Sequence, residues 1–191
     1  MTRDEILTAA AQIFSQKGFH AASMQDIAEA VNLQKASLYH HISSKQEILL
    51  AILDRALDML IEYLEQVTAL DLTPDVKLRR AMEAYLQAML DHHDLAAVLL
   101  LEHRSLEPQF QLRHIPRRDR FERLWRDMIQ EGIDEDLFFT PDPALASRYL
   151  LGVMNWTITW YRPDGSLSPA ALSGQFTDLF LNGLLMRRDS S

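Results

Sequence analysis

The sequence predicts an all-α protein. Apolar residues recur at intervals of three and four along most of the chain, which is the spacing of one face of an α-helix. Runs of β-branched residues are few, and glycine is limited to six of the 191 residues. Proline-bearing segments separate the apolar stretches, as expected where one helix ends and another begins. These features favour helices over strands.

The first two predicted helices are bounded by residues typical of helix ends. One face of the first helix is apolar and comprises Ile6, Ala10, Ile13 and Phe14. Gly18 suits the left-handed conformation that often follows the last turn of a helix. Ser23 begins the second helix, with Asp26 three residues later as its reciprocal capping partner. Asn32 tolerates the left-handed backbone of a tight turn between helices.

A short third helix over about residues 35–41 and a long fourth helix follow. Ser44 and Glu47 repeat the capping-box spacing at the start of the fourth helix, which extends to about residue 67. Pro116 is expected to kink or to start a helix that contains residues 117–132. Proline-bearing breaks divide the remainder at residues 72–75, 107–110, 140–143 and 162–169.

Composition restricts the class of protein. Hydrophobic residues make up 48% of the chain, which suffices for a substantial core. There is no cysteine, so disulfides, thiol catalysis and cysteine zinc sites are excluded. No apolar run approaches the roughly 20 residues needed to cross a bilayer, and the first residues lack the pattern of a secretion signal. We therefore expect a cytoplasmic protein with no membrane partner.

The net charge of −8 is unevenly distributed. Residues 1–50 contain four basic and five acidic side chains, whereas the remaining residues contain 15 basic and 22 acidic ones. The first segment is almost neutral, and Lys35 and Lys45 flank its most polar stretch. The acidity of the chain as a whole therefore does not exclude nucleic-acid binding, because the placement of charge decides.

Residues 18–49 have the layout of a helix-turn-helix, in which two short helices joined by a tight turn are braced by a third. Small and apolar side chains on the inner side of the predicted third helix are Ala36, Leu38 and Ile42. Polar side chains on its outer side are Gln34, Lys35, Ser37, Tyr39 and His40. Such a helix fits the major groove of DNA, where short side chains reach base edges and longer ones reach phosphates.

The stretch GFHAASMQDIAEAVNLQKASLYHHISSKQEIL, residues 18–49, resembles the DNA-binding segment of the tetracycline-repressor (TetR) family. The matching features are Gly18-Phe19, Ser23, Asp26-Ile27-Ala28, Lys35, Leu38-Tyr39-His40-His41, Ser44-Lys45 and Glu47. Asn32, Ala22, Ala36 and Ile42 depart from the residues usual in the family. The resemblance implies that DNA is bound by Ser23, Gln34, Lys35, Ser37, Tyr39, His40 and Lys45, with Arg3 as an amino-terminal arm contact.

The resemblance also implies an organisation for the whole chain. Residues 1–47 would form the DNA-binding domain, and residues 48–191 a helical effector-binding and dimerisation domain. The last two helices would pair two copies into a homodimer that acts as a repressor by binding a palindromic double-stranded operator. Its two heads would lie about 34–36 Å apart, the spacing of successive major grooves.

An effector pocket is expected among the middle helices. Its predicted lining comprises Met82, Tyr85, Met89, Phe121, Trp125, Met128, Met154, Trp156, Trp160 and Arg162. The stretch NWTITWYRPDGSLS, residues 155–168, is similar to a branch of the family that responds to acyl-coenzyme A thioesters. The arginines within residues 113–120 are either ligands for such a molecule or part of a solvated helix face.

Two alternatives stay open at this point. One is a DNA-binding regulator whose body recruits protein partners and binds no small molecule. The other is a small helical enzyme that uses the His/Asp cluster at residues 91–94. No nucleophile elbow, phosphate loop or His-Glu-x-x-His spacing supports catalysis. We therefore expect no enzymatic activity, no cofactor and no metal site.

Overall fold

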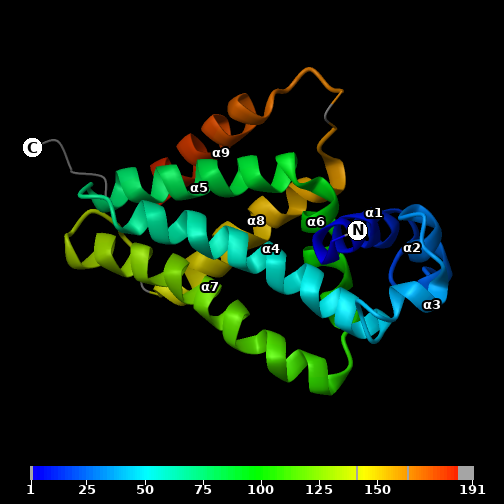
Figure 1. Cartoon of the computed structure of the whole chain (residues 1–191). Coiled ribbons are helices and arrows are strands. Elements are labelled where there is room, and N and C mark those ends of the chain that lie inside the picture. Colours follow the sequence, from blue (N-terminus) through cyan, green and yellow to red (C-terminus); the bar gives the residue numbers. More distant parts are fainter. Residues whose placement is uncertain (1, 141, 163, 185–191) are drawn as a thin grey trace, which may run out of the picture. The chain divides into compact units, whose positions relative to one another are not determined.

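The computed structural model describes residues 2–140, 142–162 and 164–184 (Figure 1). Over these residues the regular elements are helices and no strand occurs, which confirms the predicted all-α fold. The chain forms two compact units. The first contains Met1–Met59 and His92–Arg118, and the second contains Leu60–Asp91 and Asp119–Ser191. The domain boundary expected between residues 47 and 48 stays a prediction.

The first unit begins with α1 (Arg3–Lys17) and α2 (Met24–Ala30), and their ends confirm the predicted signals. Gly18 follows α1 with a φ of 80°, a value that favours glycine. Ser23 and Asp26 form a complete capping box at the start of α2. Asn32 has a φ of 54° in the turn after α2, as expected for a left-handed residue.

Helix α3 (Lys35–Leu38) is shorter than the predicted helix over residues 35–41. After Leu38 the chain keeps turning, but the amides of His40 and His41 bond to carbonyls three residues back, those of Ser37 and Leu38. These tighter bonds end the α-helical pattern without extending the chain. The side chains after Leu38 therefore still follow a helical path.

The core of this part of the chain anchors α3 from beneath. Fully or almost fully buried apolar side chains are Ile6, Ala10, Phe14, Phe19, Ile27, Leu38 and Ile42. The rings of Phe14 and Phe19 meet edge to face, with centroids 5.3 Å apart. Leu38 is completely buried, so the opposite side of α3 must point outward.

Helix α4 (Lys45–Thr68) begins as predicted, with the hydroxyl of Ser44 accepting the amide of Glu47. The first unit also holds α6 (His93–Ala97), the π-turn η1 (Val98–Glu102) and the 3-10 turn η2 (His103–Ser105). Helix α7 (Pro108–Asp134) extends, like α4, into the second unit.

Pro116 lies inside α7, so the expectation that it starts a helix is wrong. The helix begins eight residues earlier at Pro108, where a first-turn proline needs no amide partner. Pro116 removes one bond, to the carbonyl of Leu112, and the Leu112 residue is 71% exposed. The carbonyl left without an amide is therefore on a solvated part of the helix.

The second unit contains α5 (Pro74–Asp91), α8 (Pro143–Trp160) and α9 (Pro169–Leu184) besides the later parts of α4 and α7. Helices α5 and α9 pack side by side (Figure 1). The core of this unit includes Leu64, Leu78, Met82, Trp125, Ile129, Leu150 and Leu181. After α7 the chain reverses, and the buried ring of Phe138 packs directly on Gly132.

Candidate nucleic-acid interface and effector region

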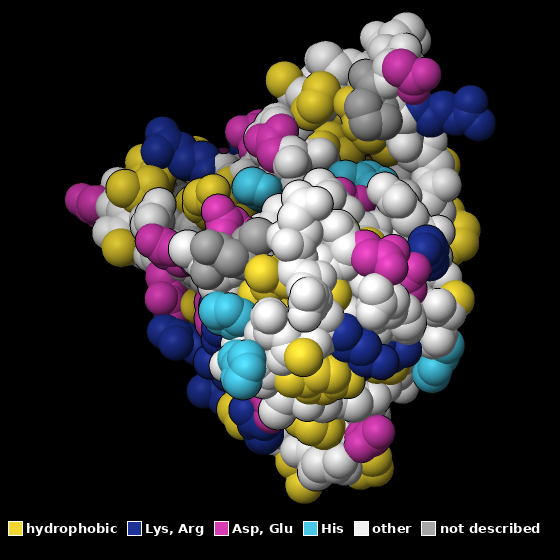
Figure 2. All heavy atoms as spheres, turned by 45° about the vertical axis from the view of Figure 1, so that its right-hand side comes forward, with side chains coloured by type: hydrophobic (Ala, Val, Ile, Leu, Met, Phe, Trp, Pro, Cys, Tyr) yellow, Lys and Arg dark blue, Asp and Glu magenta, His cyan; other side chains and the backbone are white. Residues whose placement is uncertain are grey.

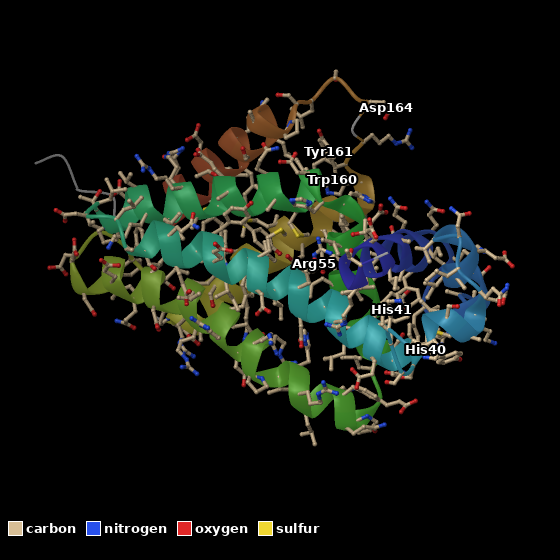
Figure 3. The ribbon with its side chains drawn as sticks, in the orientation of Figure 1. His40, His41, Arg55, Trp160, Tyr161 and Asp164 are labelled. Atoms are coloured by element: carbon tan, nitrogen blue, oxygen red, sulfur yellow. The ribbon has the colours of Figure 1, made fainter. Side chains whose placement is uncertain are left out.

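The predicted reading surface of α3 is exposed. Gln34, Lys35, Tyr39 and His40 are all exposed, and Ser37 is half-buried beside them. His40 lies just beyond α3, in the turn before α4 (Figure 3). The structure thus brings five of the seven predicted DNA-binding residues onto one short stretch of surface. Their contacts with DNA stay predictions.

Ser23, the sixth residue, is exposed but already bonded within the chain. Its hydroxyl donates to Asp26 Oδ2 at 2.6 Å and also accepts the amide of Asp26 at 3.1 Å. Lys17 Nζ lies 2.8 Å from Asp26 Oδ1. The Lys17 ammonium, together with Ser23, holds the pKa of the Asp26 carboxyl well below its usual range. Asp26 therefore stays ionised and keeps α2 capped.

Lys45, the seventh residue, has a position that the sequence did not indicate. Its ammonium donates to the carbonyls of Phe19 at 2.8 Å and Ala22 at 2.7 Å, and lies 4.4 Å from the centroid of the Phe19 ring. The side chain thus joins the start of α4 to the loop before α2. Its predicted contact with a phosphate stays a prediction.

A polar hollow of about 360 Å³ lies beside the reading surface. It is lined by Arg3, Tyr39, His40, His41, Ile42, Ser43 and Glu47. Arg3, predicted as an arm contact, therefore lies next to the segment that follows α3. His41 is exposed and lines the same hollow, but it was not among the predicted DNA-binding residues. Its position directly after His40 was the only sequence feature that pointed to it.

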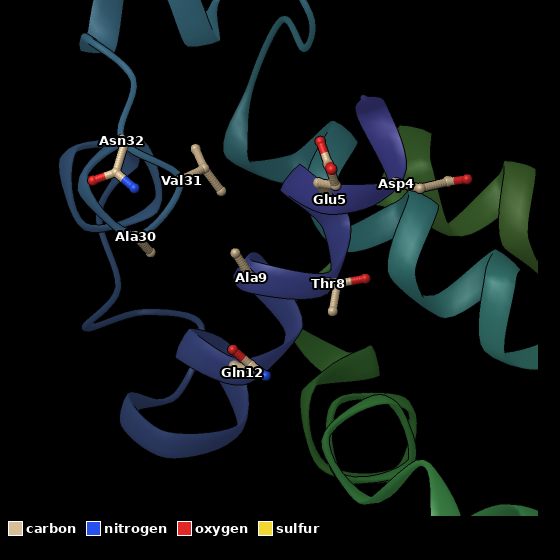
Figure 4. A pocket seen from close by; sticks show the side chains of 8 residues that line it. All are labelled: Asp4, Glu5, Thr8, Ala9, Gln12, Ala30, Val31 and Asn32. Carbon is tan, nitrogen blue, oxygen red and sulfur yellow. The ribbon is translucent and has the colours of Figure 1, made fainter. Parts of the chain in front are cut away.

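The charges of this part of the chain are sparse. Lys17 is paired with Asp26 and Lys45 with backbone carbonyls, which leaves Lys35 and Arg3 as its exposed basic side chains near the reading surface. Figure 2 shows isolated Lys and Arg side chains over most of the face in view, and a group of them along its lower left edge beside histidine side chains. A second hollow, on α1 and the end of α2, is lined by Asp4 and Glu5 and does not suit a phosphate (Figure 4).

Most of the predicted effector residues are buried in the second unit. Met82, Tyr85, Met89, Phe121, Trp125, Met128 and Met154 are each at most 7% exposed. The ring centroids of Tyr85 lie 5.9 Å from Phe121 and 5.7 Å from Trp125. Tyr85 also donates a hydrogen bond of 2.5 Å to Asn155 Oδ1, and burial raises the pKa of its phenol. The tyrosine therefore stays a neutral donor.

Trp156, Trp160 and Arg162 lie apart from that cluster, on the surface. Trp156 is 66% exposed and Trp160 is 49% exposed, and Arg162 is also exposed. The two tryptophans continue a row of exposed apolar residues along α8, which we call the α8 stripe: Leu145, Tyr149, Val153, Trp156 and Trp160. Trp160 marks the end of this row in Figure 3. An effector contact for these residues stays a prediction.

Comparison with known proteins identifies the relatives of the chain. Residues 6–52 match the model described as bacterial regulatory proteins, tetR family. Residues 71–184 match the model described as tetracyclin repressor-like, C-terminal domain. The chain belongs to the TetR family of transcriptional regulators. The resemblance of residues 18–49 is thereby confirmed, and this TetR-family chain is a DNA-binding transcriptional regulator.

Relatives of this TetR-family regulator match over almost its whole length. The HTH-type transcriptional repressor KstR2 of Mycolicibacterium smegmatis is 30% identical over 185 residues, which cover 95% of this chain and 90% of the relative. The TetR-family regulator PfmR of Thermus thermophilus superimposes with a TM-score of 0.86 at 38% identity, covering 94% of this chain and 98% of PfmR. A structure of AibR in complex with isovaleryl coenzyme A and operator DNA superimposes with a TM-score of 0.85 at 26% identity, covering 96% of this chain and 97% of AibR.

The arginines at 113–120 of this TetR-family chain largely face carboxylates of α4. Arg113 lies 2.9 Å from Glu47, and Arg117 lies 3.0 Å from Asp54 and 2.9 Å from Asp58. Arg120 is paired with Glu65. The structure therefore gives these three arginines partners within the protein.

The cluster at residues 91–94 offers little for catalysis or metal binding. Asp91, His92 and His93 are exposed, and Asp91 accepts a hydrogen bond from Gln87. Across the described part of the chain, no three His, Asp or Glu side chains gather in a metal-binding arrangement. Among the same residues, no helix is long and apolar enough to span a membrane.

Proposed function

We propose that this regulator is a repressor that binds a palindromic operator as a homodimer and releases it when a small, largely apolar effector binds. The observation that carries the proposal is the α3 surface. Lys35, Tyr39 and His40 are exposed, while Leu38 between them is completely buried. A short helix held in this way presents polar side chains to the major groove and cannot turn them inward.

The homodimer is supported by the α8 stripe. Its five residues are each between 40% and 66% exposed, and Leu179 on α9 is 77% exposed. Large apolar residues exposed on both of the last two helices are unusual for surfaces that face only water. A second copy would cover these residues through one self-complementary contact, as twofold symmetry requires.

The effector is supported by the buried methionines and aromatics of the second unit. Methionine side chains adapt to contents of variable shape. Met82, Met89, Met128 and Met154 are all buried in the same unit as the aromatic cluster. An acyl-coenzyme A thioester is the effector class that the AibR complex suggests. The rival, a regulator without a small-molecule ligand, differs in one respect: no ligand would release its DNA.

A gel shift on the DNA upstream of the protein's own gene tests the proposal. The wild-type protein should retard this DNA, and K35A/H40A should weaken binding by about tenfold or more, because each lost groove contact costs about 1–3 kcal/mol. R80A/R123A is the matched control, since Arg80 and Arg123 are exposed residues of the second unit. Decanoyl-coenzyme A, added to the wild-type complex, should release the DNA.

Two results would contradict parts of the proposal separately. Equal retardation by wild type and K35A/H40A would remove α3 as the reading helix. Retardation that decanoyl-coenzyme A and other acyl thioesters leave unchanged, with intact DNA binding, would favour the regulator without a ligand.

A further inference from the structure

The second unit contains a groove between α7 and α8 that the proposed function has not used. Its volume is about 260 Å³. Glu122 and Arg126 line it from α7, and Ser147, Arg148 and Asn155 line it from α8. We call this the α7–α8 groove. None of these five residues was among the predicted effector residues.

The charged rim of the groove favours an anion. Two guanidinium groups, those of Arg126 and Arg148, face one carboxylate, that of Glu122. Arg148 has no ion pair with any described residue, and Arg126 lies 3.9 Å from the carboxylate of its chain neighbour Asp127. Guanidinium groups bind carboxylate or phosphate oxygens through paired N–H donors. Both arginines can therefore meet an anionic group without first breaking a strong ion pair.

One residue of the groove also contacts the aromatic cluster. Asn155, which lines the groove, is the residue whose Oδ1 accepts the hydrogen bond of Tyr85. Tyr85 in turn packs against Phe121 and Trp125. Asn155 is thus shared by the charged groove and the buried aromatic cluster.

The aromatic cluster also contains an unpartnered donor. Trp125 is completely buried, and its Nε1 has no hydrogen-bond acceptor among the described residues. Buried N–H groups are nearly always bonded, so a donor without an acceptor indicates a position where a further acceptor is accommodated. A carbonyl of a bound molecule is one such acceptor.

We propose that the α7–α8 groove binds the anionic end of an amphipathic effector, whose apolar end enters the cluster at Tyr85. The inference rests on the proposed function, because it assigns a place to the effector of that regulator. The ligand class is an apolar chain with a terminal anionic group. The anion is either the carboxylate of a free acid or the phosphates of a coenzyme A thioester, and both satisfy the same arginines.

Titration calorimetry on the full-length protein tests the groove with three probes that share one tail: decanoate, decanoyl-coenzyme A and 1-decanol. At least one anionic probe should bind wild type about tenfold or more tightly than 1-decanol, which lacks the charge-assisted hydrogen bonds. R126Q/R148Q should remove that preference. R80Q/R123Q, which changes the charge equally at exposed positions outside the groove, should keep it.

The outcomes separate this inference from the proposed function. Stronger binding of decanoate assigns a carboxylate to the groove, and stronger binding of decanoyl-coenzyme A assigns the phosphates. Three results would overturn the proposed anion site in the groove. Wild type and R126Q/R148Q could bind the anionic probes with equal affinity, or both double variants could lose the same affinity. In the third, neither anionic probe binds at about 1 mM. A gel shift without any probe, run on the same preparations, tests DNA binding independently. Its failure would overturn the proposed function even where the groove binds its probe.

Discussion

Lys45 carries one of the few basic groups of the DNA-binding part of the chain, and its ammonium lies on backbone carbonyls of the loop before α2. Lys45→Met keeps the length of the side chain but leaves the carbonyls of Phe19 and Ala22 without their donor. We expect the free energy of unfolding to fall by about 1–3 kcal/mol, the range for stranding buried polar groups. Urea unfolding without DNA measures it.

The same variant separates two roles of Lys45. If Lys45 only contacted phosphate, Lys45→Met would weaken DNA binding and leave the unfolding midpoint unchanged. K35M is the control, because Lys35 is exposed on α3 and none of the described hydrogen bonds or ion pairs involves its side chain. It should weaken DNA binding with the unfolding midpoint unchanged.

Among the glycines, Gly132 is the one at which an added methyl group has the least room. A Cβ at this position would lie 2.1 Å from Cδ2 of Phe138, a ring that is itself only 2% exposed. Gly132→Ala should lower the free energy of unfolding by about 1–3 kcal/mol, as overpacking does. Gly174→Ala is the control, because a Cβ there meets nothing within 4 Å. A thermal melt in which both variants match wild type would refute the close approach.

At the level of single elements, local sequence signals predicted the helix ends correctly, whereas contacts between distant residues could not be predicted. The capping box of Ser23 and Asp26 and the left-handed Asn32 depend on neighbours within a few residues, so their chemistry is readable from the sequence. The hydrogen bond from Lys45 to the carbonyl of Phe19 joins residues 26 positions apart, so the periodicity of the sequence cannot predict it. The alternative in which Pro116 starts a helix was wrong, because a proline removes only one backbone hydrogen bond. The packing of the whole helix decides whether α7 continues through it.

In the first unit, charged side chains of α4 and α7 form a network of contacts that was not predicted from the sequence. Asp54 Oδ1 lies 2.8 Å from Nδ1 of the buried His114, and Asp54 Oδ2 lies 3.0 Å from a terminal guanidinium nitrogen of Arg117. Asp58 lies 2.9 Å from Nε of the same arginine. The Asp54 side chain is 18% exposed and that of Asp58 is 58% exposed. Removing one partner of a partly buried charge network costs more stability than removing one partner of an exposed ion pair, because the remaining buried groups are left without a partner.

Asp54→Asn and Asp58→Asn therefore form a matched pair of variants. We expect D54N to lower the free energy of unfolding by about 2 kcal/mol and D58N by at most about 0.5 kcal/mol. Chemical denaturation of both variants, at one pH and ionic strength, measures the difference. Equal losses would mean that the burial of Asp54 does not strengthen its contacts.

For the molecule as a whole, the α8 stripe was only partly predicted. The family resemblance implied that the last two helices pair two copies, but Trp156 and Trp160 were assigned to an effector pocket. Periodicity shows which residues of a helix share a face and does not show what that face meets. The exposed position of both tryptophans now favours a partner copy as their cover.

Val153 lies in the middle of the α8 stripe and is 54% exposed. Val153→Arg places a charge where the proposed interface excludes water, so the variant should be monomeric at micromolar concentration while the wild type is dimeric. Gln130→Arg, at an exposed position of α7, should remain dimeric. Sedimentation velocity distinguishes the species. A dimeric V153R would move the interface away from α8.

In the proposed complex, two copies of the α3 surface read successive major grooves on one side of a duplex. Hydroxyl-radical footprinting on the upstream DNA tests this arrangement. We expect two protected stretches centred about one helical turn, or a whole number of turns, apart. Both stretches should weaken together in K35A/H40A and in the monomeric V153R. A single protected stretch, or protection that survives the loss of Lys35 and His40, would contradict it.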